Sequence, residues 1–200
     1  MKNGVLREYA YGDQLFNYGA LPQTWEDPKV LLPETGTPGD NDPIDVLDIG
    51  TKQWSVGSIV RIKILGVLGL VDAGETDWKL VAVSAEDPLA SVLNDLSDVN
   101  THMPGAIDAL RTWLRLYKLP VVNSFVFDGA ARDRAFALAL VEETHGYWQA
   151  LVTGDGPGSL GADATGAVPC IVAAGLKRVT SKNALASLMG TPHPSGGGGD

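Results

Sequence analysis

The sequence has 200 residues, 44% of them hydrophobic and 20% charged, which fits one globular domain with a substantial core. Fifteen basic against 24 acidic residues leave a net charge of −9, which argues against binding DNA or RNA by neutralising phosphates. No apolar run approaches the roughly 18 residues that span a bilayer. The N-terminus lacks a signal-peptide pattern, and the single cysteine, Cys170, excludes an internal disulfide. We therefore expect a soluble protein without nucleic-acid or membrane partners.

The first segment with a clear structural signal is residues 17–28, NYGALPQTWEDP. Its two prolines, glycine and tryptophan predict an ordered, non-helical loop packed by its aromatic side chains. Residues 39–45, GDNDPID, combine a glycine, an asparagine and a proline with three aspartates, and this composition predicts a turn. The hydrophobic run that follows at residues 44–49 indicates that this turn leads into a buried strand.

Two further strands are predicted on either side of a second acidic turn. Apolar and basic residues alternate at positions 60–64, which is the period of a half-buried strand. The glycines at 57, 66 and 69 indicate bends or bulges of the kind that close a small barrel. The turn at residues 72–77, DAGETD, leads into residues 78–83, whose side chains alternate between two faces. If the sheet curls back on itself, the two acidic turns meet.

Helices are predicted in the second half of the chain. Residues 87–102 indicate a loop with a short turn or helix. Apolar residues at helical spacing predict an amphipathic helix over 105–118, stopped by Pro120. A second, longer helix is predicted over 129–152, with Asp128 placed to cap it.

The composition changes after Gly154 to glycine, alanine, serine and threonine. We therefore expect one domain at residues 1–154. The tail at residues 155–200 is expected to be poorly ordered, with a weak helix near 182–189.

Five aspartates in the two acidic turns carry the strongest chemical signal: Asp40, Asp42, Asp45, Asp72 and Asp77. If they converge to about 5 Å, each pair repels by roughly 3 kcal/mol at an effective dielectric constant near 20. Such a cluster needs a cation or wide solvent exposure. Oxygen ligands without histidine favour Mg²⁺, Mn²⁺ or Ca²⁺ over zinc. The EF-hand pattern does not fit, because its sixth position must be glycine and is Asp45 here.

Four motifs occur along the chain: NYGALPQTWEDP, GDNDPIDVLDIG, DAGETDWK and RLYKLP. In order and spacing they resemble the soluble, family I inorganic pyrophosphatases of the eukaryotic, fungal-like branch, over residues 17–152. The resemblance implies Mg²⁺-dependent hydrolysis of diphosphate to two phosphates, with Mn²⁺ as a substitute metal. It also implies a cytoplasmic homodimer.

The resemblance further implies a role for each candidate site residue. The implied metal ligands are Asp40, Asp45, Asp72 and Asp77. The implied substrate-binding residues are Arg7, Lys79, Tyr117 and Lys118. Asp42 would act as general base on the attacking water. Tyr18 is implied as a second catalytic residue, in contact with the groups around this water. Without the resemblance, Lys79 would be interpreted as a solvated strand residue, and Tyr117 and Lys118 as the end of an amphipathic helix.

In this family a substantial N-terminal section precedes the first motif and supplies strands and ligands, whereas sixteen residues precede Asn17 here. The expected fold class is α+β, a small closed or partly closed antiparallel β-barrel of the OB-like type with flanking helices. We expect this barrel to be incomplete at the N-terminus. The alternative to an active hydrolase is a catalytically impaired, pyrophosphatase-like protein that binds divalent metal or dimerises.

Overall fold

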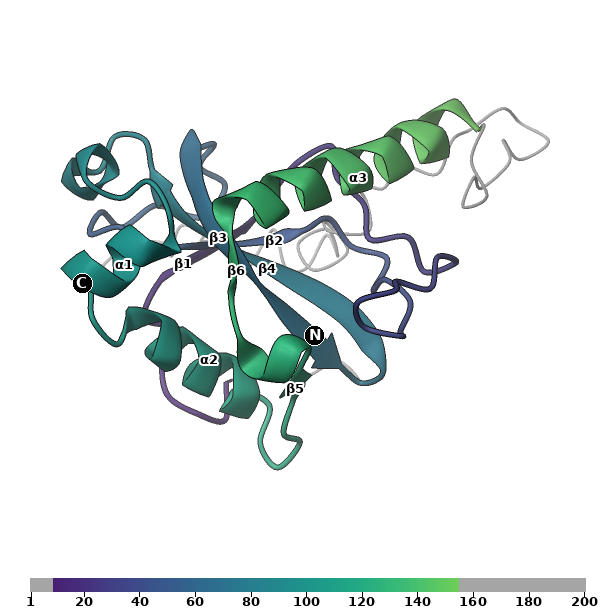
Figure 1. The fold of residues 1–200 in the computed structure, drawn as a ribbon, viewed down its shortest axis with the longest axis horizontal. Helices are drawn as coiled ribbons and strands as arrows, with labels where there is room; N and C mark the ends of the chain where they lie inside the picture. Colours follow the sequence, from purple (N-terminus) through teal and green to yellow (C-terminus); the bar gives the residue numbers. More distant parts are fainter. Residues whose placement is uncertain (1–8, 155–200) are drawn as a thin grey trace, which may run out of the picture.

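A computed structural model describes residues 9–154 (Figure 1). The strands of its single sheet are β1 (Asn17–Ala20), β2 (Asp45–Asp48), β3 (Ile62–Asp72), β4 (Glu75–Ser84), β5 (Ser124–Phe125) and β6 (Arg132–Asp133). The α-helices are α1 (Leu96–His102), α2 (Ala106–Leu116) and α3 (Arg134–Thr153), and short 3-10 helices span Pro88–Ser91 and Phe127–Gly129. Arg7 and the predicted tail, with its weak helix, lie outside the described residues.

The sheet has the strand order β1-β2-β4-β3-β5, and β6 also pairs with β3. Strands β2 and β4 are parallel, whereas the other pairs are antiparallel. The parallel pair is explained by the chain between its strands, because the long crossover through β3 returns the chain in the same direction. The α+β class is confirmed. Over residues 9–154 the sheet is mixed and does not close into a complete barrel.

The predicted strand, turn and strand at residues 62–84 are confirmed as the hairpin of β3 and β4. Asp72 pairs with Glu75, so Ala73 and Gly74 form a two-residue turn, and both have positive φ, at 53° and 89°. This geometry matches the right-handed twist of the flanking strands. The predicted bulge is present between Ile64 and Gly66. The hairpin therefore places the two ends of the second acidic turn side by side.

Two apolar clusters pack on opposite faces of the sheet. Val81 and Val83 of β4 belong to a cluster with buried residues of α1 and α2. Leu80 and Ala82 belong to a second cluster that includes buried residues of α3. Figure 1 shows α2 and α3 on opposite sides of the strands. The alternation predicted for residues 78–83 is therefore confirmed.

The predicted amphipathic helix at 105–118 is confirmed as α2. Its buried residues have the spacing of one helix face: Ile107, Leu110, Trp113 and Leu114. Tyr117 is the C-cap residue of this helix, and its backbone N–H donates to Trp113 O. Helix α2 thus delivers Tyr117 and Lys118 to the end of β3.

The predicted start of the long helix at residue 129 is wrong. Helix α3 begins at Arg134, and the carboxylate of Asp133 caps it by accepting from Phe136 N at 2.9 Å. Asp128 instead lies in a 3-10 turn with a φ of 52°. A residue at positive φ cannot continue into an α-helix, and residues 132–133 pair with β3 before the helix starts.

Residues 17–28 combine a strand and a loop. Asn17 to Ala20 pair with β2 as strand β1, a tertiary pairing that turn-forming composition did not indicate. The remainder is non-helical, and Trp25 is buried, as predicted for a loop packed by its aromatics. None of the helices within residues 9–154 combines the length and apolar character needed to cross a membrane.

Candidate metal and anion site

The acidic turn, residues 39–45, is held against the loop that carries Glu26. The backbone N–H of Glu26 donates to Asp42 O at 3.0 Å, and Asn41 N donates to Glu26 O at 2.9 Å. Gly39 makes this contact sterically feasible, since a Cβ there would lie 2.4 Å from the backbone carbon of Glu26. Two segments that are separate in sequence are therefore fixed to each other through their main chains.

The same turn is tied to the start of β4. Thr76 N donates to Pro38 O at 2.7 Å, and Gly39 forms a parallel bridge with Thr76. Asp40 follows this bridge on one segment and Asp77 follows it on the other. The two aspartates consequently lie next to each other, although 37 positions separate them in the sequence.

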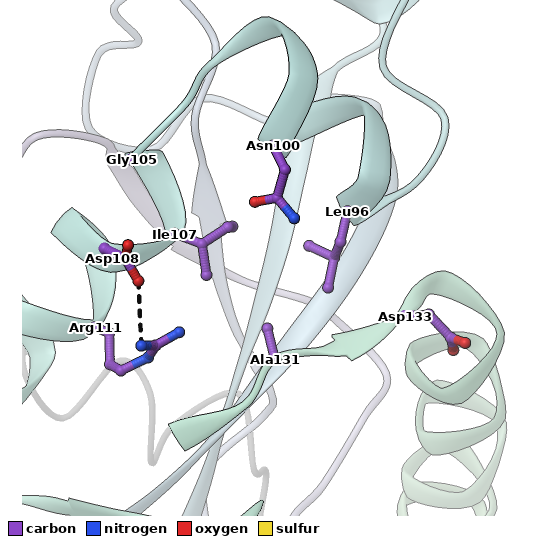
Figure 2. Close-up of a pocket in the computed structure, with 8 residues that line it drawn as sticks. All are labelled: Leu96, Asn100, Gly105, Ile107, Asp108, Arg111, Ala131 and Asp133. Carbon is purple, nitrogen blue, oxygen red and sulfur yellow. Dashed lines mark ion pairs between the residues drawn. The ribbon is translucent and has the colours of Figure 1, made fainter. Parts of the chain in front are cut away.

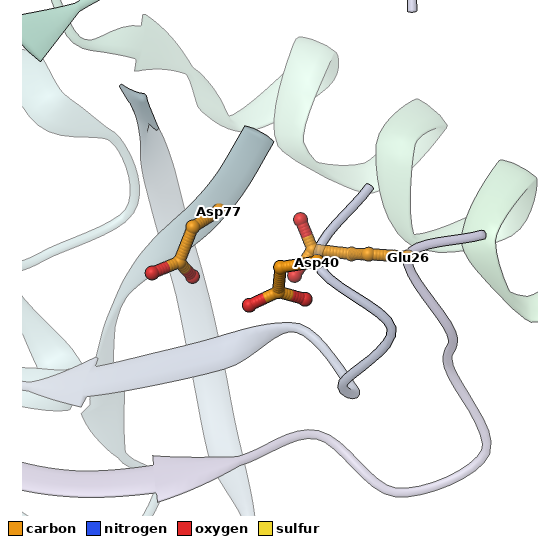
Figure 3. A group of neighbouring side chains, drawn as sticks. All are labelled: Glu26, Asp40 and Asp77. Carbon is orange, nitrogen blue, oxygen red and sulfur yellow. The ribbon is translucent and has the colours of Figure 1, made fainter. Parts of the chain in front are cut away.

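Glu26, Asp40 and Asp77 each place one carboxylate oxygen within 4.8 Å of the other two (Figure 3). Glu26 Oε1 accepts from Trp78 N at 2.9 Å, whereas Glu26 Oε2 is buried and has no partner among residues 9–154. Asp40 Oδ1 accepts from Asp42 N at 3.0 Å. Three carboxylates thus converge with few donors to compensate their charges.

The pKa values of all three carboxyl groups are raised. Burial raises the pKa of Asp40 to about 8, with a further contribution from the charge of Asp77. Burial raises the pKa of Asp77 to about 6, although Lys79 acts in the opposite direction. Burial, followed by the charges of Asp40 and Asp77, holds the pKa of Glu26 well above its usual range. Ionising all three groups together is therefore unfavourable, and a cation at this place would favour their charged forms.

Lys79 lies between two of the predicted metal ligands. It pairs with Asp45 across the parallel β2–β4 register, and its Nζ forms ion pairs with Asp45 and Asp77. Lys79 is buried, so its interpretation as a solvated strand residue is wrong. Burial lowers the pKa of Lys79, but the charges of Asp45 and Asp77 outweigh this and raise it well above its usual range.

Tyr18 contacts this network from strand β1. Its hydroxyl donates to Asp45 Oδ2 and accepts from Lys79 Nζ at 3.0 Å. Burial is the main reason that the pKa of Tyr18 is raised, so this hydroxyl stays protonated at neutral pH. It can therefore act as a donor.

A second group forms where α2 ends beside β3. Lys118 Nζ forms an ion pair with Asp72, and Tyr117 Oη donates to the same carboxylate oxygen at 3.2 Å. Burial and then the charge of Asp72 raise the pKa of Tyr117. The charge of Asp72 also contributes to the raised pKa of Asp77, so this group borders the first one.

The structure brings together nine of the ten residues singled out in the sequence: Tyr18, Asp40, Asp42, Asp45, Asp72, Asp77, Lys79, Tyr117 and Lys118. Arg7, the tenth, lies outside the described part of the chain. Asp42 is half-buried, and its charge adds to the raised pKa of Asp40, which places it beside the cluster. The convergence of the two acidic turns is therefore observed.

Glu26 was missed by reasoning from the sequence. It lies in the segment NYGALPQTWEDP, which was assigned a structural role through its aromatic residues. A signal was present, because a glutamate directly after a buried tryptophan in an ordered loop needs a partner for its charge. Its partners come from distant segments, and only the folded chain reveals them.

The donor set fits a hard divalent cation. Every candidate ligand in the cluster is a carboxylate oxygen, which suits Mg²⁺, Mn²⁺ or Ca²⁺. The unpartnered Glu26 Oε2 supports this fit, because a buried oxygen without a donor is unfavourable unless a cation or water satisfies it. The expected oxygen-ligand site is thus consistent with the geometry.

A cavity of about 420 Å³ lies elsewhere, between α1, α2 and β6 (Figure 2). Its polar lining includes Asn100 and the ion pair of Arg111 with Asp108, whose atoms are 3.1 Å apart. None of the nine convergent residues lines it. The acidic groups on β2, β3 and β4 are therefore the better candidate for chemistry.

Comparison with known proteins gives consistent results. The model of the inorganic pyrophosphatase family matches residues 5–149. The inorganic pyrophosphatase of Bos taurus is 48% identical over 160 residues, which cover 76% of this chain and 55% of that protein. That of Candida albicans is 46% identical over 171 residues, covering 82% and 59%. The chain therefore spans little more than half the length of these curated relatives.

Solved structures agree with the sequence comparison. A recombinant inorganic pyrophosphatase from T. brucei brucei superposes with a TM-score of 0.75 at 44% identity, covering 80% of this chain and 47% of that one. An N-terminally truncated vacuolar soluble pyrophosphatase from Trypanosoma cruzi, in complex with PPi, gives a TM-score of 0.74 at 46% identity, covering 76% and 59%. The chain belongs to the inorganic pyrophosphatase family.

Proposed function

We propose that this protein hydrolyses diphosphate to two phosphates with Mg²⁺ as its metal, for which Mn²⁺ can substitute. The observation that carries the proposal is the convergence of carboxylates from two distant turns around the buried Lys79. A related vacuolar pyrophosphatase with the same fold was crystallised in complex with PPi. Both observations support a site that binds a small, highly charged phosphate anion through cations.

Charge balance explains why the site needs metal. Diphosphate is strongly anionic, and an aspartate cluster repels it unless cations lie between them. The four aspartates proposed as ligands are Asp40, Asp45, Asp72 and Asp77. Divalent cations held there would neutralise charge on the phosphates and lower the pKa of bound water. The residues of the chain then have to position the substrate and move the proton.

Asp42 is the proposed general base. It belongs to the same rigid turn as Asp40, and its backbone N–H is held by the Asp40 carboxylate at 3.0 Å. Asp42 is half-buried, and its charge adds to the raised pKa of Asp40, so it lies beside the cluster. From there it would accept a proton from an attacking water.

Lys79, Tyr117 and Lys118 are the proposed phosphate-binding residues. Both lysines are paired with aspartates, Lys79 with Asp45 and Asp77, and Lys118 with Asp72. A cation bound by these carboxylates would take over that neutralising role and release the ammonium groups toward the substrate. They would then offset charge that develops on the leaving phosphate. Arg7 is proposed as a further phosphate ligand from the family resemblance.

The test is phosphate release from diphosphate by the full chain, with and without Mg²⁺. The Asp42→Asn variant should reduce the rate by about 10²- to 10⁴-fold, the usual contribution of a general base. Glu142→Gln on the exposed face of α3 removes one negative charge in the same way and should leave the rate unchanged. Folded protein that releases no phosphate above a metal-free blank would refute the proposal.

A cytoplasmic location and a homodimeric assembly are proposed from the family resemblance. Sedimentation analysis of the purified chain should give twice the monomer mass. Cell fractionation should recover the protein with cytoplasmic markers. A monomeric mass at micromolar concentration, or recovery in an organelle fraction, would contradict these two proposals without affecting the proposed reaction.

A further inference from the structure

Glu26 has a buried oxygen that the proposed reaction does not yet use. The residue is 2% exposed, and its Oε1 accepts from Trp78 N at 2.9 Å. Its Oε2 is buried and receives no hydrogen bond from residues 9–154. A buried carboxylate oxygen without a partner is costly, so the position is explained best by a ligand that the oxygen binds.

The geometry around Glu26 indicates what this ligand is. One oxygen each from Glu26, Asp40 and Asp77 lies within 4.8 Å of the other two. Figure 3 shows their carboxylates close together, projecting from three separate segments of the chain. Oxygens at this separation that carry like charges can share one positive ion at their centre. A divalent cation with oxygen ligands fits this arrangement.

Glu26 is held rigidly in this position. Its backbone N–H and C=O are both bonded to the acidic turn, at 3.0 Å to Asp42 and 2.9 Å to Asn41. Its side chain is anchored at the other end by Trp78 N of strand β4. The loop, the turn and the strand are thus connected through one glutamate. A ligand fixed in this way loses little conformational freedom when it binds a metal.

Asp45, one of the four metal ligands that the family resemblance implied, has partners that Glu26 Oε2 lacks. Its carboxylate accepts from the hydroxyl of Tyr18 and forms an ion pair with Lys79. Glu26 Oε2, by contrast, meets no donor within the described chain. Glu26 Oε2 can therefore bind a cation beside Asp40 and Asp77 without giving up a hydrogen bond, whereas Asp45 and Asp77 would first have to release Lys79.

We propose that Glu26 is a direct metal ligand, and that with Asp40 and Asp77 it forms a buried three-carboxylate site for one divalent cation. The inference rests on the proposed function only in that the cation is the one used in hydrolysis. The cation can be bound before diphosphate arrives, since all three ligands belong to the folded chain. Trp78 N, through its bond to Oε1, keeps Oε2 directed at the ion.

The experiment is calorimetric titration of the full chain with Mn²⁺ in the absence of diphosphate. Glu26→Gln retains the shape and the acceptor for Trp78 N but removes the charge, and should weaken the tightest Mn²⁺ site on the order of 100-fold. Glu26→Asp keeps the charge but shortens the side chain, and it should also weaken Mn²⁺ binding. Glu34→Gln, on an exposed loop, is the matched control and should bind Mn²⁺ like the wild type.

Thermal unfolding without metal separates a ligand from a structural residue. If Glu26 is a ligand, Glu26→Gln should unfold at the same or a higher temperature than the wild type, because the variant removes an acidic group that is costly to bury beside two others. It should then gain less stability from added Mn²⁺. Mn²⁺ binding like that of the wild type, or a lowered unfolding temperature with unchanged affinity, would overturn the proposal.

The outcomes for the site and for the proposed reaction are distinguishable. Weakened Mn²⁺ binding in Glu26→Gln supports the ligand role even if the wild-type chain hydrolyses no diphosphate. Hydrolysis by the wild type together with unchanged Mn²⁺ binding in the variant would retain the reaction and reject Glu26 as a ligand.

Discussion

Two groups of buried carboxylates contact strand β4, and they differ in how many donors they receive. Asp48 and Asp87 lie near the end of this strand, and each is 4% exposed. Asp48 accepts from four groups: Gly50 N, Ser84 N, Asn17 Nδ2 and Trp54 Nε1. Asp87 also accepts from four: Thr51 N, Thr51 Oγ1, Lys52 N and Leu89 N. These donors hold together the loops at that end of the sheet.

The acidic cluster near the start of β4 has far fewer donors. Glu26 receives one backbone N–H, and so does Asp40, while Asp77 has the ammonium group of Lys79. The pKa values follow this difference. Burial acts to raise the pKa of Asp87, but hydrogen bonds from Leu89 and Thr51 outweigh it and lower that pKa. In the cluster, burial prevails and the pKa values rise.

The comparison teaches that acidity and burial do not identify a binding site, whereas unsatisfied acceptors do. Asp48 and Asp87 need no cation, because the protein supplies their hydrogen bonds. The carboxylates of the cluster receive too few donors to balance their charges, and they could hold a cation. Changes in each group should therefore affect different properties, stability in the first and metal binding in the second.

The largest effect is expected for Asp48→Ala. The change leaves two backbone donors and two side-chain donors without their acceptor, and should lower the free energy of unfolding by about 3 kcal/mol or more. Urea unfolding without metal would measure it, with Glu142→Ala as an exposed control. A loss below about 1 kcal/mol would show that these hydrogen bonds do not distinguish the two groups.

Asp40→Asn should impair metal binding and not the stability of the metal-free protein. Without metal, the variant should be at least as stable as the wild type, because burial beside Asp77 disfavours the ionised form of Asp40 and the asparagine removes this cost. It should lose the stabilisation by Mg²⁺, which for the wild type is about 2.7 kcal/mol at a concentration 100-fold above the Kd. Thermal unfolding at increasing Mg²⁺ measures both quantities. Stabilisation equal to that of the wild type would contradict the assignment of Asp40 as a ligand.

Gly39→Ala tests the contact that positions the cluster. The added Cβ would lie 2.4 Å from the backbone carbon of Glu26, so the loop or the turn must move. We expect a loss of about 2 kcal/mol in the free energy of unfolding, as in other overpacked sites, and weaker Mn²⁺ binding. Gly19→Ala is the matched control, since its Cβ meets nothing within 4 Å. If Gly39→Ala and Gly19→Ala are equally stable, the close contact at Gly39 is not what positions the cluster.

The smallest effect is expected for a change of one pH unit. Because the pKa of Asp40 is raised to about 8 and that of Asp77 to about 6, the folded protein keeps protons that the unfolded chain releases near pH 4. The stability of the metal-free protein should therefore fall as the pH rises from 6 to 8, by at most about 1.4 kcal/mol per pH unit for each retained proton. Mg²⁺ should flatten this slope, as unfolding at several pH values would show.

Much of the candidate site could be predicted from the sequence, because its residues cluster in short motifs. Asp40, Asp42 and Asp45 share one turn, and Asp72 and Asp77 flank another. Turn composition and the alternation in β4 placed both turns at strand ends, and the structure agrees. The parallel pairing of β2 with β4 was not predicted. It joins strands that are separated in the chain by β3, and no local pattern indicates which distant strands pair.

Local periodicity determined the amphipathic helix α2, the hairpin of β3 and β4, and the positions of both acidic turns, because helix, strand and turn signals act within a few residues. Only the tertiary structure decided that Lys79 is buried between Asp45 and Asp77, and that Glu26 joins Asp40. These contacts depend on which strands pair and which loops pack together. Such pairings join residues far apart in the chain, where sequence spacing carries no information about distance.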